Sequence, residues 1–249
     1  MYHSPLETFE VLLYRPFFLF SLDISFTNAT LFLGLAALVL SLLALAHFRS
    51  QLVPSGAQLL SEQLYRFVLA MVSEQTGGAA LGFFPLFLLV FLLIAVSNLL
   101  GLLPFAFTTT AQFALTFALA LAFNLGFVLL GFWLHGFGFL RLFLPAGAPA
   151  PLLPLIAAIE VVSYLIRTFS LSIRLFANMM AGHTLLHILS TFVLQLLKLG
   201  GPLGVLAALV PLVLVLAVFA LELGIALIQA YVFTILLAIY SNDSYHPVH

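Results

Sequence analysis

The longest apolar stretches of this chain exceed what one upright membrane crossing requires. Residues 155–201 form a run of 47 residues without proline, and a second apolar stretch covers residues 205–240. A helix of the first length would be about 70 Å long, more than twice the roughly 30 Å hydrocarbon core of a membrane. We therefore expect two overlong helices that tilt strongly, curve or leave the bilayer. The Gly-Gly-Pro sequence at 200–202 is the turn signal that folds them into a hairpin.

Composition agrees with a membrane protein. Hydrophobic residues make up 64% of the 249 residues and charged residues only 6%. A soluble domain carries about 25% charged residues, so this chain cannot cover itself with a hydrated surface. The sequence shows no alternation of apolar and polar residues at every second position, which argues against an outer-membrane barrel. The chain lacks cysteine, which excludes disulfides and thiolate sites, and its net charge of −1 suggests no nucleic acid partner.

We predict an all-α integral membrane protein of about five spans plus an amphipathic surface helix, built as a single membrane domain over residues 1–249. Its expected parts are an N-terminal segment at 1–28, a first span at 29–48, the amphipathic helix at 57–75, a two-span hairpin at 83–135 and the long tilted helical hairpin at 152–240.

The segment at 57–75 has the pattern of an amphipathic helix. Its apolar residues recur at helical spacing, at Leu60, Leu64, Phe67 and Met71. Its polar residues fall on the opposite face. This periodicity fits a helix that lies along the membrane surface and fits equally well a helix packed against a neighbour.

The first long helix carries its polar residues on two faces. At 100° per residue, one stripe within about 40° contains Glu160, Arg167, Arg174 and Asn178. His183 lies nine residues after Arg174, about 180° around the helix, and His187 follows one turn later. Arg174 therefore lies between two sets of titratable groups, and the sequence alone leaves the role of Arg167 open.

Arg174 has no acidic partner within reach on its own helix, because Glu160 is about 21 Å away along the axis. Charges inside a membrane are costly and mark pairs or water pathways. If the hairpin runs antiparallel, Gln229 lies level with Arg174 and could hold its guanidinium. Glu222 then lies level with His183, and the two form a proton-exchanging or metal-binding pair.

This pattern predicts two separate half-pathways for protons. A fixed cation between the titratable groups would repel protons and attract a carboxylate on a carrier. A proton would then cross the membrane only if the carrier moved it from one half-pathway to the other.

The histidine spacing allows a metal ion as an alternative to a metal-free relay. His183 and His187 are four residues apart on one helix face, so both imidazoles could bind one divalent ion such as Zn²⁺, with Glu222 as an oxygen ligand. A water-bridged proton relay would use the same geometry. No other cofactor is required.

Four segments resemble one known family. "LSIRLFANMMAGH" (171–183), "LELGIALIQAYVFTILLAIY" (221–240) and "SNLLGLLPFAFTTTAQ" (97–112) are similar to subunit a of the F-type ATP synthase. "SPLETFEV" (4–11) is similar to the start of the mature mitochondrial protein. The resemblance covers nearly the whole chain. It implies a stator subunit that is not catalytic by itself and that conducts protons in a rotary ATP synthase of the mitochondrial inner membrane.

The resemblance also implies partners and residue roles. Arg174 would be the essential arginine that faces the rotor ring of c subunits, with Asn178 and Gln229 beside it. Other membrane-sector subunits, the peripheral stalk, lipids and protons would be further partners.

The same resemblance assigns the two half-channels. Glu160 would belong to the half-channel on the matrix side, and His183 and Glu222 to the one on the intermembrane-space side.

Two other functions fit the sequence less well. A self-contained proton-coupled transporter or channel would be expected to show internal repeats and broken helices, and neither is visible in the sequence. A quinone or haem subunit would be expected to carry histidines on facing helices, whereas His183 and His187 share one helix.

Overall fold

The computed structural model describes residues 9–16, 18–19, 22–23, 25–48, 55–78, 81–103, 106–143, 152–198 and 200–245. The helices of this part of the chain are α1 (Asn28–Phe48), α2 (Gly56–Thr76), α3 (Phe84–Gly101), α4 (Phe113–His135), α5 (Leu153–Lys198) and α6 (Gly201–Tyr245). Three short 3₁₀ helices accompany them: η2 (Leu81–Phe83), η3 (Thr109–Ala111) and η4 (Gly136–Phe143). Two small antiparallel pairs precede α1, formed by β1 (Leu13–Arg15) with β4 (Phe26–Thr27) and by β2 (Phe18–Leu19) with β3 (Leu22–Asp23).

The prediction of a helical multi-pass membrane protein is confirmed. In the described residues, five helices are long and apolar enough to cross a membrane, namely α1, α3, α4, α5 and α6. Many of their leucine side chains are exposed, which suits a surface in contact with lipid rather than water. The short strands before α1 are the extended structure that the sequence did not predict.

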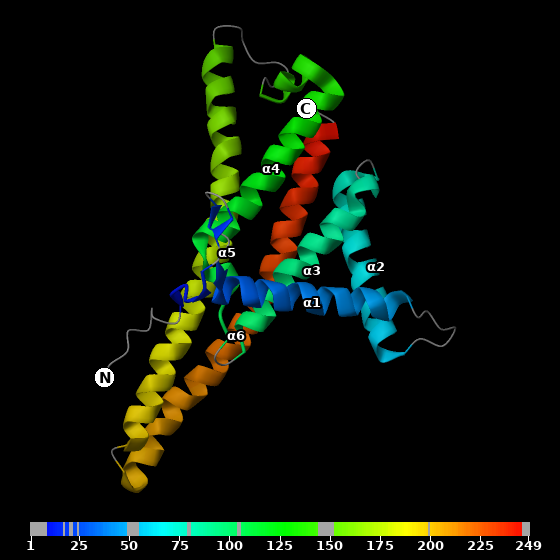
Figure 1. Ribbon diagram of the computed structural model, residues 1–249. Coiled ribbons are helices and arrows are strands. Elements are labelled where there is room, and N and C mark those ends of the chain that lie inside the picture. The colour runs from blue at the N-terminus through cyan, green and yellow to red at the C-terminus, as the bar shows by residue number, and fades with distance from the viewer. Residues whose placement is uncertain are drawn as a thin grey trace.

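The two longest helices form the predicted hairpin. With 46 residues in α5 and 45 in α6, each helix is about 68 Å long or slightly more. They meet at Gly200 and Gly201, whose φ angles of 73° and 76° lie in the left-handed region that favours glycine. Figure 1 shows α1 running across the direction of α5 and α6. If α1 crosses the membrane upright, this crossing means that the hairpin is strongly tilted in the membrane.

The core lies where α3, α4 and the middle of the hairpin meet. Helices α3 and α4 each contact α6 more extensively than they contact each other, so α6 joins these consecutive spans. Phe87 of α3 stacks on Phe127 of α4, with ring centroids 6.1 Å apart. From α5 and α6, Leu175 and Phe233 are fully buried in the same cluster.

Helix α2 packs against its neighbours and also exposes apolar residues. It contacts α1, α3 and α6, and its buried side chains include Val68, Met71 and Val72. Leu60 and Phe67, which the sequence places on the same apolar face as Met71, are exposed. The packing alternative is therefore correct for one side of the helix, and the exposed leucine and phenylalanine leave an apolar surface that suits lipid.

Helix α6 extends five residues beyond its predicted end at residue 240, to Tyr245. The residues after Tyr240 are polar, yet Ser241 and Ser244 among them are buried. Ser244 is buried, and its hydroxyl donates to the Phe127 carbonyl oxygen of α4 at 2.9 Å. Asp243 lies 3.9 Å from Arg167 of α5. The partners on α4 and α5 explain why the helix continues.

Candidate functional site

A cluster of His183, Glu222, Thr108 and Gly182 joins α5, α6 and the α3–α4 connection. The His183 Nε2 atom lies 3.9 Å from Glu222 Oε1 and 3.1 Å from Thr108 Oγ1. Glu222 is only 1% exposed. Its two carboxylate oxygens have no hydrogen-bond partner among the described residues. The hairpin register predicted that Glu222 lies beside His183, and the structure brings the two together.

Gly182 allows this close approach of the two helices. A Cβ atom at this position would lie 2.8 Å from Glu222 Cδ and would collide with its Oε1 atom. The absent side chain therefore leaves the space that the carboxylate occupies. Glycine at this position keeps Glu222 against α5, next to the imidazole of the following residue.

The α3–α4 region supplies two residues of this site that sequence reasoning missed. Thr108 contacts His183 directly. Asn98 of α3 donates from Nδ2 to the Ala226 carbonyl oxygen at 3.1 Å, one turn after Glu222 on α6. Both residues belong to the segment 97–112, which resembles the known family. The sequence alone does not show that the loop in this segment packs against α5.

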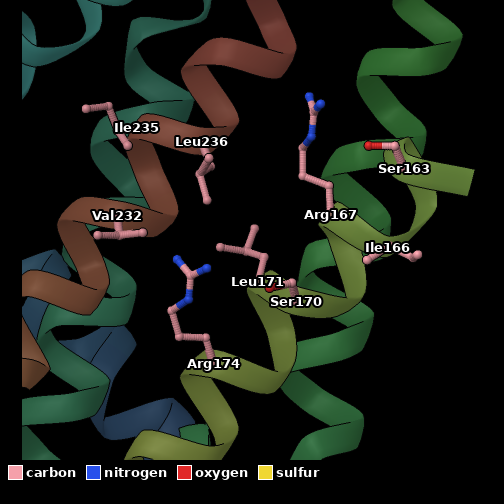
Figure 2. Close-up of a pocket in the computed structure, with 9 residues that line it drawn as sticks. All are labelled: Ser163, Ile166, Arg167, Ser170, Leu171, Arg174, Val232, Ile235 and Leu236. Carbon is pink, nitrogen blue, oxygen red and sulfur yellow. The ribbon is translucent and has the colours of Figure 1, made fainter. Parts of the chain in front are cut away.

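A groove between α5 and α6 contains Arg174. It has a volume of about 450 Å³, and it is lined by Ser163, Ile166, Arg167, Ser170, Leu171, Arg174, Val232, Ile235 and Leu236. Figure 2 shows the guanidinium groups of Arg167 and Arg174 pointing into the gap between the two helices, beside apolar side chains of α6. Arg174 is exposed and makes no ion pair with a described residue. It therefore presents an uncompensated positive charge on an apolar surface.

The predicted contact between Gln229 and Arg174 is not formed. Gln229 instead accepts a hydrogen bond of 3.3 Å from Asn178, one helical turn further along α5. Within the described structure its Nε2 atom has no hydrogen-bond partner. The expectation assumed straight antiparallel helices, and the observed pairing is shifted by one turn. Asn178 and Gln229 thus tie the hairpin together close to Arg174.

On the other side of Arg174, Arg167 has an acidic partner. Its Nη1 atom lies 3.9 Å from Asp243 Oδ2, and its guanidinium lies over the Tyr240 ring at 5.7 Å from the centroid. Glu160 lies two turns earlier on α5 and is half-buried. The antiparallel register of the hairpin would place Asp243 level with Glu160 if α6 continued to residue 243. The sequence after Tyr240 is polar, so it did not indicate that the helix continues.

The rotation of α5 is fixed near this pair by a buried polar contact. Asn124 of α4 donates a hydrogen bond from Nδ2 to Thr168 Oγ1, and both side chains are buried. Thr168 follows Arg167 directly. A buried side-chain contact of this kind specifies which face of α5 turns toward the groove.

His187 does not complete a metal-binding group in the structure. It is exposed on α5, one turn beyond His183. Across the described ranges, no set of three or more His, Cys, Asp or Glu side chains could hold a metal ion. A metal ion shared by the two histidines stays a prediction.

The model of the family described as "ATP synthase A chain" matches residues 29–242, which is most of the chain. The chain belongs to the ATP synthase A chain family. Family membership makes it a non-catalytic, multi-pass membrane subunit with a role in proton transport.

Relatives of this ATP synthase A chain family member match over nearly their whole lengths. "ATP synthase subunit a 1" of Brucella anthropi is 41% identical over 250 residues, covering 100% of both chains. "ATP synthase subunit a" of Chelativorans sp. is 45% identical over 248 residues, covering 99% of both. That of the alga Chondrus crispus is 44% identical over 241 residues, covering 96% of this chain and 95% of its own. These bacterial and algal relatives support subunit a and give no specific support to the predicted mitochondrial type.

Proposed function

We propose that this chain is the stator subunit that conducts protons in a rotary ATP synthase through two offset half-channels separated by Arg174. The observation that carries the proposal is the position of Arg174. It is exposed in the α5–α6 groove and lies between two sets of titratable side chains. The distance along α5 is about 13.5 Å to His183 and about 21 Å to Glu160.

The first half-channel ends at the pair of His183 and Glu222. Their separation of 3.9 Å is slightly longer than a hydrogen bond, so a small side-chain movement or a water molecule is enough to pass a proton between them. A buried carboxylate beside an imidazole suits this transfer, because both groups change protonation state. The proposal places this half-channel on the outer side of the membrane.

The second half-channel starts at Glu160 and includes Asp243. Glu160 is half-buried near the start of α5. Asp243, on the last turn of α6, is paired with Arg167, two turns further along α5. Glu160 and the partner of Asp243, Arg167, lie before Arg174 on α5, and His183 lies after it. Ionisable residues inside a membrane protein usually line an ion pathway, which supports this assignment.

Arg174 would act as the electrostatic divider. A guanidinium and a carboxylate about 4 Å apart attract each other by about 4 kcal/mol at an effective dielectric constant of 20. A proton at the same distance would be repelled by a similar amount. Arg174 would therefore bind the ionised carboxylate of a passing carrier and block direct proton passage between the half-channels.

The carrier would be a rotor ring of c subunits with one carboxylate each. The apolar wall of the groove, formed by Val232, Ile235 and Leu236, suits contact with another apolar helix. Other membrane-sector and peripheral-stalk subunits are further proposed partners. The proposed location is an energy-coupling membrane, and more specifically the mitochondrial inner membrane. Subcellular fractionation tests the specific location.

The test measures passive proton conduction by the assembled complex in vesicles, driven by a potassium diffusion potential. Replacement of Glu222 by Gln or Glu160 by Gln should lower conduction strongly, because each variant removes one proton-binding group. Glu62→Gln on α2 is the matched control, because Glu62 lies on another helix, where it accepts a hydrogen bond from Gln58. Unchanged conduction in both test variants would contradict the proposal.

A further inference from the structure

Thr108 makes a direct contact with the imidazole of His183. It lies in the connection between α3 and α4, immediately before η3, and it is buried. Its Oγ1 atom is 3.1 Å from His183 Nε2 and 3.4 Å from the Gly101 carbonyl oxygen. One hydroxyl group therefore has two partners, a ring nitrogen and a carbonyl oxygen.

The two partners allow Thr108 to serve both protonation states of Nε2. When Nε2 carries a hydrogen, it donates to Oγ1, and the hydroxyl hydrogen turns to the Gly101 carbonyl oxygen. When Nε2 has lost its hydrogen, the hydroxyl turns and donates to it. The ring keeps a hydrogen bond to Thr108 in both protonation states. This bond holds the orientation of the ring while it exchanges a proton.

The backbone at Gly101 holds Thr108 in this position. A Cβ atom on Gly101 would lie 2.9 Å from Thr108 Oγ1 and 3.1 Å from its Cβ, so the threonine packs directly against the end of α3. The ring of Phe9 makes an edge contact with His183, at 6.4 Å between centroids. The imidazole is thus contacted by Thr108 and Phe9, and its Nε2 atom lies 3.9 Å from Glu222 Oε1.

We propose that Thr108 is a positioning residue that holds the His183 imidazole beside Glu222 through its cycle of proton uptake and release. This inference rests on the proposed function, because it requires that the pair exchanges protons. Among the described residues, Glu222 is the charged group within ion-pair distance of this imidazole. Thr108 itself carries no proton across the membrane; it acts through His183.

A neighbouring threonine provides a matched control. Thr110 lies in η3, two residues after Thr108, and it is also buried. In the part of the chain that the structure describes, its hydroxyl has no hydrogen-bond partner. Replacing either threonine by valine keeps the side-chain shape and removes the hydroxyl, so only the hydrogen bond distinguishes the two variants.

The experiment compares Thr108→Val, Thr108→Ser and Thr110→Val in the intact complex, by passive proton conduction in vesicles. Thr108→Val should lower conduction about threefold to tenfold, the size expected for one lost hydrogen bond. Thr108→Ser should restore it, and Thr110→Val should leave it unchanged. In a His183→Ala background, Thr108→Val should have no further effect. If Thr108→Val does not assemble, Thr108→Ala and Thr108→Ser answer the same question, because only serine keeps a hydroxyl.

The outcomes separate this inference from the proposed function. Normal conduction after His183→Ala and Glu222→Gln would contradict the proposed function. Loss of conduction in those two variants, with Thr108→Val as active as the unmodified complex, would overturn only the role of Thr108. Equal losses in Thr108→Val and Thr110→Val, or no rescue by serine, would also overturn it, because packing would then explain the effect.

Discussion

The carboxylate of Glu222 and the imidazole of His183 lie 3.9 Å apart on facing helices of the long hairpin. Arg174 is on the same helix as His183 but faces the open groove. Glu222 is buried and His183 is half-buried, whereas Arg174 is exposed and accessible to a partner from outside. In the proposed function the His183–Glu222 pair exchanges protons and Arg174, on another surface of the hairpin, separates the half-channels.

The carboxyl group of Glu222 should be required for conduction. Glu222→Gln keeps the shape and removes the proton-binding oxygen, so passive conduction should fall by about 100-fold, the lower end of what positioned proton-transfer groups contribute. Glu222→Asp should keep part of the activity, because it retains a carboxyl group in the same space. An assembled Glu222→Gln complex that conducts at the normal rate would remove Glu222 from the pathway.

A methyl group at position 182 should disturb the same pair. In Gly182→Ala the new Cβ atom would collide with the Glu222 carboxylate, an overpacking cost of about 1–3 kcal/mol. Conduction should fall, and combining Gly182→Ala with Glu222→Asp should recover part of it, because the aspartate side chain is shorter. Gly126→Ala is the control, since a Cβ atom there meets nothing within 4 Å. No difference between the two alanine variants would show that the space at Gly182 is not needed.

The ion pair of Arg167 and Asp243 should matter more for conduction than for stability. The Arg167 side chain is 37% exposed, so the pair contributes at most about 1 kcal/mol to folding. Asp243→Asn should leave the complex assembled and slow conduction several-fold, because it removes a titratable group from the half-channel that is proposed to start at Glu160. Arg167→Gln should slow conduction less, since Asp243 can still bind a proton. The reverse order of effects would argue that the arginine, not the aspartate, serves this side.

The predicted metal ion has a direct test. If Zn²⁺ binds His183 and His187, added Zn²⁺ should inhibit proton entry from the His183 side, and His187→Ala should raise the concentration needed for half inhibition. His135→Ala is a useful control, because His135 lies on α4 and its Nε2 atom contacts the Tyr245 carbonyl oxygen. Equal inhibition of His187→Ala and the unmodified complex would rule out a site shared by the two histidines.

Much of the fold could be predicted because the membrane imposes strong limits on sequence. Span lengths, the glycine turn and the facing of Glu222 and His183 follow from helix geometry and the length of the apolar runs. The final turn of α6 could not be predicted, because Asp243 and Ser244 are polar and only their partners on α5 and α4 make them part of a helix.

Contacts that depend on loops or on helix crossing were also beyond the sequence. Thr108 reaches His183 from a connection whose path no periodicity describes. Helix geometry placed Gln229 level with Arg174, but Gln229 accepts its hydrogen bond from Asn178, one turn further along α5, because the pairing of the two helices is shifted. Small errors of register move a side chain to a different partner, whereas the identity of the polar residues on each helix is unaffected.

The most direct test of the divider is Arg174→Ala in the assembled complex, with ATP synthesis and passive proton conduction measured in the same vesicles. Arg66→Ala, an exposed arginine on α2, controls for the loss of a positive charge. The account predicts that Arg174→Ala abolishes proton-driven ATP synthesis while protons still leak through the membrane sector, and that Arg66→Ala changes neither. ATP synthesis at the normal rate by assembled Arg174→Ala complexes would contradict it.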